Sequence, residues 1–276
     1  MRKLDLLRRI KKIARLSFSL LKSKVALLWL EYSSCSNANQ DLFRIHLLVV
    51  KQEKYVPISR ICVISFLYFH PNSVVFLHAD RNTLPSLQEW KLRKKYANSI
   101  KFVELMDTEN KTWQDLKLQL IYQLSGTSDI FIDADLKWNG PLEESMLDDR
   151  YVYFFVEEYK LTENPTFMEM LSQQQFSDYR DSSMWNTSFV CLSGFTITTE
   201  QVEEVNLLQE QILSYARKFI MNKSEANSVI RISEQLAISL AASKWEKKIK
   251  ALKATDGYKD GSFLESSYFG ATGTHF

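Results

Sequence analysis

Two carboxylates one residue apart, Asp133 and Asp135, follow directly after the apolar run 130–132, and a turn signal (Asn-Gly-Pro) follows at 139–141. A short apolar run bounded in this way is typical of a buried strand. In an open α/β sheet, ligands bind at the carboxyl ends of strands, so the two acids are expected at a ligand-binding edge. Two hard oxygen ligands suit Mg²⁺ or Mn²⁺ that carries a phosphorylated substrate. The alternative is a pair of acids that only ends a strand in solvent.

Strand and helix patterns alternate around this motif from residue 41 onward. Buried-strand patterns are expected at 43–50, 73–80, 100–105, 128–135, 151–156 and 185–194. Helix patterns are expected at 56–69, 84–96, 113–124, 200–220 and 233–245. Residues 160–183 are expected to form a helix and loop that cover a site. Strand-helix-strand repeats of this length predict an α/β fold, with a doubly wound, mainly parallel sheet flanked by helices and joined by right-handed crossovers.

Length and composition set the class of protein. A chain of 276 residues with 45% hydrophobic residues is long enough for one large domain, or for one domain and a tail. Seven glycines and five prolines over the whole chain argue against linkers and repeats. The three cysteines, without a Cys-x-x-Cys motif, indicate thiols in a reducing compartment rather than a zinc site or a disulfide.

Basic residues are concentrated near the N-terminus. Residues 2–24 contain nine basic residues and one acidic residue, which leaves 26 basic and 32 acidic residues in the remainder. Apolar residues recur there at three- and four-residue spacing, so residues 1–40 are expected to form a basic amphipathic segment ahead of a domain at 41–276. Such a segment suits an anionic membrane surface, contacted through residues 1–30. The alternative is a helix that packs on its own domain and leaves a solvated basic face.

Two other interpretations of this segment are disfavoured. Lys22 and Lys24 interrupt the apolar stretch 16–30, which is then too short for a transmembrane span. Nucleic-acid binding is disfavoured because the remainder is acidic and contains no recognisable nucleic-acid module. The protein is therefore expected in the cytoplasm, peripheral to the inner face of the membrane.

The motif and its neighbours resemble the nucleotide-sugar-dependent glycosyltransferases of the GT-A fold. Residues 113–120 (Trp-Gln-Asp-Leu-Lys-Leu-Gln-Leu), followed by 128–135, are similar to the helix and Asp-x-Asp strand of several bacterial members. Residues 185–190 (Trp-Asn-Thr-Ser-Phe-Val) are similar to the Asn-Ser-Gly-Val strand of the family. Here Ser188 and Phe189 stand where Gly-Val is usual.

Two later segments extend the resemblance, which covers the order of elements over residues 41–276. Residues 233–237 (Ser-Glu-Gln-Leu-Ala) are similar to an acidic helix found late in many members. The last two residues, 275–276 (His-Phe), are similar to the C-terminal His-Phe or His-Tyr of some families. The resemblance implies transfer of a sugar from a nucleoside-diphosphate sugar to a glycan or lipid-linked acceptor, in the synthesis of a cell-surface polysaccharide.

The resemblance also implies roles for particular residues. Asp135, with Asp133 directly or through water and the ribose, would hold a Mn²⁺ or Mg²⁺ that bridges the two phosphates, and His275 would be a further metal ligand. The alternative for His275 is a disordered tail. Asp80 would touch the nucleoside, and Lys117 would meet phosphate or pin the Asp-x-Asp strand. The sugar and acceptor side would be lined by Glu157, Trp185 and Asn186.

The catalytic base is the least determined part of the site. An inverting transferase needs a general base near the acceptor hydroxyl, whereas a retaining one can use the leaving phosphate. Glu234 and Asp181 are the candidates for a catalytic acid or base. For Glu234, beside Ser233, the alternative is a capping or surface acid. The spacing of these residues does not distinguish the two stereochemical outcomes.

Two competing functions use the same residues. An apolar strand that ends in Asp-x-Asp also opens the haloacid dehalogenase phosphatases, where the first acid is a nucleophile. Their motif lies near the start of the domain with Thr or Val two residues beyond the second Asp, whereas this chain has Lys137 there. The other alternative is a GT-A domain that has lost turnover and binds a glycan or a partner. The departures at Ser188 and Phe189 keep this alternative open.

Overall fold

The computed structural model describes residues 35, 38, 41–51, 55–90, 94–138, 140–142, 147–155, 157–252 and 264–266. Nearly all of the predicted N-terminal segment at 1–40, including residues 1–30, lies outside the described residues, as does His275. The division into a segment at 1–40 and a domain at 41–276 therefore stays a prediction. Within the described part, no helix is long and apolar enough to span a bilayer.

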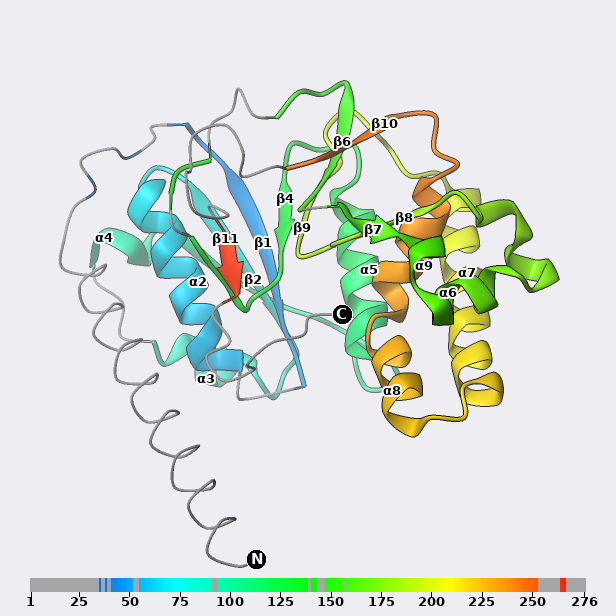
Figure 1. The fold of residues 1–276 in the computed structure, drawn as a ribbon. Coiled ribbons are helices and arrows are strands. Elements are labelled where there is room, and N and C mark those ends of the chain that lie inside the picture. The colour runs from blue at the N-terminus through cyan, green and yellow to red at the C-terminus, as the bar shows by residue number, and fades with distance from the viewer. Residues whose placement is uncertain are drawn as a thin grey trace, which may run out of the picture.

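A seven-stranded sheet forms the centre of the molecule (Figure 1). Its strands, in spatial order, are β10 (Lys248–Ala251), β6 (Tyr151–Phe154), β9 (Phe189–Cys191), β4 (Ile130–Ile132), β1 (Arg44–Val49), β2 (Val74–Ala79) and β3 (Ile100–Glu104). Among these strands β9 alone runs antiparallel to its neighbours, β4 and β6; every other adjacent pair is parallel. The predicted doubly wound, mainly parallel α/β sheet is confirmed.

The short strand β4 shows why the sheet is buried on both faces. Ile130 and Ile132 belong to one hydrophobic core, and Phe131 between them belongs to the other. Successive side chains of a strand point to opposite faces, so a continuous apolar run feeds two cores at once. β1 pairs with β2 residue for residue over its whole length and with β4 through Ile45↔Ile130. The carboxyl ends of β1, β2, β3 and β4 therefore share one edge.

The helices divide between the two faces (Figure 1). One face is packed by α2 (Tyr55–Phe69), which contacts β1, and the other by α5 (Trp113–Leu124), which contacts β4. α9 (Ser233–Ala242) packs on α5 and on α7 (Thr199–Phe219), which in turn contacts α8 (Lys223–Arg231). The remaining helices are α3 (Leu84–Gln88), α4 (Lys94–Ala97), α6 (Pro165–Leu171) and the 3-10 turns η2 (Leu161–Glu163) and η3 (Gln174–Tyr179).

Two small sheets complete the described fold. β5 (Leu136–Trp138) pairs with β11 (Leu264–Ser266), and β7 (Glu157–Lys160) pairs with β8 (Ser183–Trp185), both antiparallel. The helix start at Trp113 follows from its cap, because the Thr112 hydroxyl accepts a hydrogen bond from the Asp115 N–H while the Asp115 carboxylate accepts one from the Thr112 N–H. This capping box confirms the predicted bounds of the helix that carries Lys117.

Two sequence predictions differ from the structure, and one helix was not expected. The expected helix at 84–96 is two short helices, α3 and α4. The expected strand at 185–194 is two strands, because the Asn186 Oδ1 accepts a hydrogen bond from the Ser188 N–H at 2.9 Å and turns the chain between β8 and β9. α8 was not expected, since its apolar face is narrow and most of its residues are exposed.

Candidate active site at the carboxyl end of β4

Asp133 stands at the end of β4 and is bound from two other elements. Its N–H donates to the Ser188 carbonyl at 2.9 Å, and its carboxylate accepts a hydrogen bond from the Ser188 hydroxyl at 2.9 Å. The Lys117 ammonium, from α5, lies 2.9 Å from Asp133 Oδ1. The Asp133 side chain is still 26% exposed, so part of the carboxylate at the sheet edge is open to solvent although Lys117 and Ser188 bind it.

Lys117 is a buried cation between two carboxylates. Its side chain is only 4% exposed, and its ammonium lies 3.7 Å from Glu234 Oε1 in addition to its contact with Asp133. Burial lowers the pKa of Lys117, but Asp133 and Glu234 outweigh that effect and hold the pKa above its ordinary value. Lys117 therefore carries its charge inside the protein. Its two predicted roles, to meet phosphate or to pin the Asp-x-Asp strand, both stay predictions.

Glu234 lies in the first turn of α9 and is 2% exposed. Burial raises its pKa to about 7, although Lys117 acts in the opposite direction. Glu234 Oε2 is buried and has no hydrogen-bond partner among the described residues. The alternative of a surface acid is therefore wrong, because the side chain is buried in the charge cluster. The capping alternative stays a prediction, since the carboxylate accepts backbone hydrogen bonds from Glu234 and Gln235 in the first turn of α9.

Asp135 is half-buried in the turn between β4 and β5. Its negative charge adds to the effects that raise the pKa of Lys117, after those of Asp133 and Glu234, and to the effect of burial that raises the pKa of Cys62. The Cys62 Sγ of α2 is 3.9 Å from the Asp133 carbonyl oxygen, and burial raises the pKa of this thiol well above its ordinary value. Cys62 is thus a neutral, packed thiol rather than a nucleophile.

Asp80 ends β2 at the same sheet edge but is largely engaged by backbone. Its carboxylate accepts hydrogen bonds from the N–H groups of Lys51 at 2.6 Å, Asn82 at 3.0 Å and Thr83 at 2.9 Å, and the residue is buried. These contacts fix the turn after β2 against the end of β1. Contact with a nucleoside stays a prediction for Asp80.

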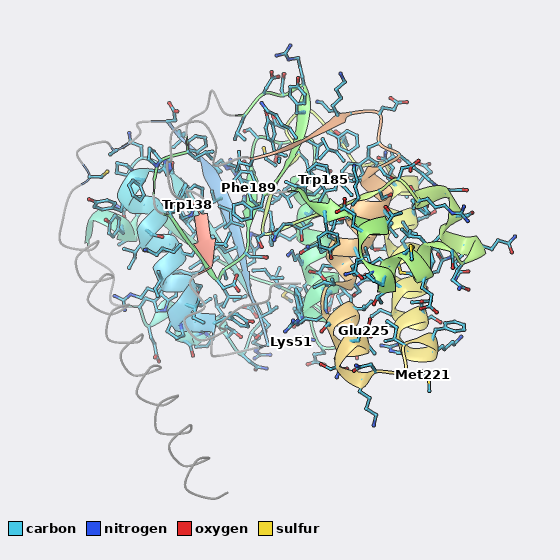
Figure 2. The ribbon with its side chains drawn as sticks, viewed as in Figure 1. Lys51, Trp138, Trp185, Phe189, Met221 and Glu225 are labelled. Carbon is cyan, nitrogen blue, oxygen red and sulfur yellow. The ribbon has the colours of Figure 1, made fainter. Side chains whose placement is uncertain are left out.

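Trp185 and Asn186 belong to the segment that carries Ser188 to Asp133. The Trp185 N–H donates to the Ser239 hydroxyl of α9 at 2.9 Å, and its ring stacks on Phe154 at 5.9 Å. The Asn186 carbonyl accepts from the Phe155 N–H at 3.0 Å. Figure 2 labels Trp185 among the elements around α9 and Phe189 beside the central strands.

Two predicted residues lie at the margin of this cluster. Glu157 is paired with Trp185 across β7 and β8, and Asp181 is exposed in the turn that precedes β8. Over the described residues, no hydrogen bond or ion pair joins Asp181 to Asp133, Lys117 or Glu234. Both residues keep their sequence-based roles as predictions.

Two contacts of the site were not expected from the sequence. Ser188 was taken only as a departure from Gly-Val, whereas its hydroxyl donates to the Asp133 carboxylate. Cys62 comes from a helix 71 residues away in sequence, and no local pattern marks it as part of the site. Over the described ranges, no group of three or more histidine, cysteine, aspartate or glutamate side chains is arranged so that it could hold a metal ion.

The chain matches known proteins in its three-dimensional structure but not in its sequence. No family model matches the chain, and no curated protein sequence matches it. The chain is similar to mouse xyloside xylosyltransferase 1 in its apo form, with 12% identity over 76% of this chain and 85% of that one and a TM-score of 0.44. It is also similar to the galactosyltransferase LgtC bound to donor and acceptor sugar analogs, with 12% identity, 69% and 70% coverage, and a TM-score of 0.43.

A third similar structure is the glycosyltransferase GlyE of Streptococcus pneumoniae TIGR4. Its identity is 9%, over 77% of this chain and 45% of that one, with a TM-score of 0.39. All three proteins are named as glycosyltransferases, the class that the sequence resembles.

Proposed function

We propose that this chain is a metal-dependent glycosyltransferase that moves a sugar from a nucleoside-diphosphate sugar to a glycan or lipid-linked acceptor. The observation that carries the proposal is the charge cluster at the carboxyl end of β4, where Lys117 joins Asp133 to the buried Glu234. A buried ion pair adds little to stability, whereas ionisable groups with shifted pKa values gather at functional sites. The cluster also lies at the sheet edge where α/β proteins bind ligands.

The donor set at this edge fits a divalent cation that also binds phosphate. Mg²⁺ is usually held by one or two carboxylates, with phosphate oxygens and water completing its coordination. Asp135 would be the direct ligand, and Asp133, already bonded to Lys117 and Ser188, would contribute directly or through water. His275 stays a predicted further ligand, and an imidazole would favour Mn²⁺ over Mg²⁺. When bound, the cation would act as a Lewis acid that stabilises the leaving diphosphate.

Several residues of the chain would have separate roles in this reaction. Lys117 and Ser188 fix the Asp133 carboxylate at the edge, so that its charge is oriented before a donor arrives. Glu234 is buried behind Lys117, and this position favours a positioning role over direct proton transfer to an acceptor. Trp185 and Asn186, which precede Ser188 in the chain, would line the sugar and acceptor side together with Glu157.

The cellular setting forms a second part of the proposal. The nine basic residues among 2–24 support contact of residues 1–30 with the anionic inner face of the membrane. A cytoplasmic, peripheral enzyme placed there would meet a lipid-linked acceptor, which suits the synthesis of a cell-surface polysaccharide.

A thermal-shift experiment tests the proposed function. The full chain is heated with each common sugar nucleotide, with and without Mn²⁺, and Asp135→Asn is compared with the matched control Asp178→Asn, an exposed acid of η3. A donor at about 100 times its dissociation constant stabilises by about 2.7 kcal/mol, which corresponds to roughly 5–10 °C for a chain of this size. We expect a metal-dependent shift with one nucleotide family, retained in the control and lost in Asp135→Asn.

Other outcomes would favour the competing functions. A chain that shows no shift with any nucleotide, but hydrolyses simple phosphate esters in a manner lost in Asp133→Asn, would be a phosphatase. A chain that shows neither property, but binds a glycan, would be a degenerate domain.

A further inference from the structure

The connection between α7 and α8 presents exposed apolar and basic side chains together. Residues 217–223 (Arg-Lys-Phe-Ile-Met-Asn-Lys), here called the α7–α8 turn, contain three basic residues, three large apolar residues and no acidic residue. Phe219 is 56% exposed and Met221 is 91% exposed. Figure 2 places Met221 at the outer end of this helix pair. Apolar side chains at such a position meet water unless another surface covers them.

The exposure of Met221 is built into the turn. α7 ends at Phe219, whose ring stacks on Tyr215 one helical turn earlier at 5.4 Å. Asn222 then caps α8, its Oδ1 accepting hydrogen bonds from the N–H groups of Ser224 at 2.9 Å and Glu225 at 3.4 Å. Met221 therefore lies between a helix end and a helix cap, which together fix it at the tip.

The charges around the tip favour an anionic partner. Arg217, Lys218 and Lys223 are all exposed, and the nearest acid along the chain, Glu225, accepts a hydrogen bond from Thr166 of α6. The other exposed large apolar residues each have an acid within three residues: Leu42 beside Asp41, Met106 beside Asp107, Met168 beside Glu169, and Leu207 three residues after Glu204. Within the same span, Phe219 and Met221 have basic charged neighbours only, and Glu225 follows four residues after Met221.

We propose that the α7–α8 turn is a docking element for an anionic lipid surface. A bilayer interface offers an apolar layer for Phe219 and Met221 directly beneath a negatively charged headgroup layer for the cations. Lys and Arg side chains reach such headgroups while their carbon stems cover apolar surface. An acidic protein surface would bind the cations but would leave Phe219 and Met221 without an apolar layer. This docking element is separate from residues 1–30 and does not depend on the proposed transferase activity.

A site-specific fluorescent probe tests the proposal in the full chain. Met221→Cys, in a Cys35→Ser background, is labelled with an environment-sensitive fluorophore, since Cys62 and Cys191 are buried. The labelled protein is mixed with phosphatidylcholine vesicles with and without phosphatidylglycerol. We expect increased, blue-shifted emission only with the anionic vesicles, and quenching by doxyl-labelled lipid. The matched control is Met106→Cys, an exposed site (75% against 91% for Met221) in an acidic surrounding, which should not respond.

Charge and apolarity can then be separated by substitution. Lys218→Glu and Lys223→Glu should each weaken vesicle partition roughly fivefold or more, because each removes a cation from the anionic surface. The double variant Phe219→Ser, Met221→Ser should weaken vesicle partition about tenfold, since both exposed apolar side chains are lost. Circular dichroism checks that each variant is folded.

Several results would overturn the proposal. A probe at 221 that keeps its solution emission contradicts it, whether or not the protein sediments with vesicles through residues 1–30. An equal response at 106, or a response caused by self-association of the chain in light scattering without lipid, contradicts it as well.

Discussion

The strand β4 has an aspartate at each end, and the two aspartates belong to different kinds of polar cluster. Asp133, after the strand, is joined to the buried Lys117 and through it to Glu234. Asp129, before the strand, is bound by His46 Nε2 at 2.9 Å and by Arg44 Nε at 3.2 Å. A three-residue strand therefore separates two networks of charged and polar side chains.

The second network continues across β1 and β2. His46 Nδ1 shares a hydrogen bond of 2.8 Å with His78 Nε2, and the His46 ring stacks on Phe76. Burial lowers the pKa of both histidines, that of His78 to about 4. The Arg44–Asp129 pair is balanced, so this network joins one acid, one arginine and two neutral imidazoles without an excess of charge.

The first network is not balanced. Asp133, Asp135 and Glu234 face one buried lysine, and Glu234 keeps an oxygen without a described partner. An excess of carboxylate at a sheet edge suits a cation and a phosphorylated ligand, whereas a network whose acid is matched by an arginine suits the fold. The two networks differ in their excess of one charge rather than in unpartnered polar atoms, because His78 Nδ1 in the second network also has no described partner.

The largest expected effect comes from removing the buried cation. Lys117→Met leaves Asp133 and Glu234 without their shared partner, and breaking a buried ion pair costs about 3–5 kcal/mol. Urea denaturation measures the loss of unfolding free energy, with the exposed Lys101→Met as the control, which should change it little. A loss at position 117 no larger than the control would mean that the cluster is not coupled through this lysine.

The histidine network should make the protein sensitive to acid. The pKa of His78 falls from 6.5 to about 4 on folding, so the folded state favours neutral imidazole. Its stabilisation is present above pH 6.5 and is lost as the pH falls toward 4, by up to about 3 kcal/mol. His78→Gln, whose amide can still donate to His46, should flatten this part of the stability profile. His70, whose pKa is also near 4, and His46, whose pKa is lowered too, contribute to the remaining pH dependence. An unchanged profile in the variant would contradict the assignment.

Glu234 should give an effect of similar size and opposite direction. Its pKa rises from 4.5 to about 7 on folding, so its contribution is present below pH 4.5 and is lost as the pH rises through 7. Glu234→Gln, which mimics the protonated acid, should gain up to about 3 kcal/mol relative to the natural chain at pH 8 and nothing at pH 4. The measurement is urea denaturation at both pH values, and equal differences at the two would exclude a raised pKa.

A smaller effect is expected at Ser188. Ser188→Ala removes the hydroxyl that donates to the Asp133 carboxylate, and a hydrogen bond to a charged group contributes about 1.5–3 kcal/mol. The matched control is Ser177→Ala, an exposed hydroxyl in η3. If the variant were as stable as the control, Lys117 alone would hold the Asp133 carboxylate in place.

Much of the fold could be predicted because its elements have strong local signals. The apolar runs of β1, β2 and β4 and the capped helix α5 lie where the sequence places them. The position of Asp133 at a sheet edge also followed from a local pattern, since it needs only a buried strand and the parallel topology.

The rest depends on contacts between distant segments. Glu234 is 101 residues from Asp133, and its burial comes from the packing of α9 on α5. Its sequence neighbours are those of an ordinary helix start, so no local pattern separates a buried acid from a surface one. β9 has only three residues, too few to show its direction, and Ser188 meets Asp133 because that strand is antiparallel.

A strand that runs against its neighbours brings its beginning to the edge where they end. For β9, this means that the chain enters the site through the turn at 186–188, beside Asp133, and leaves at the far side of the sheet. Because Ser188 in this turn holds Asp133, a change of sequence in the turn would act on the charge cluster as well as on the surface beside it.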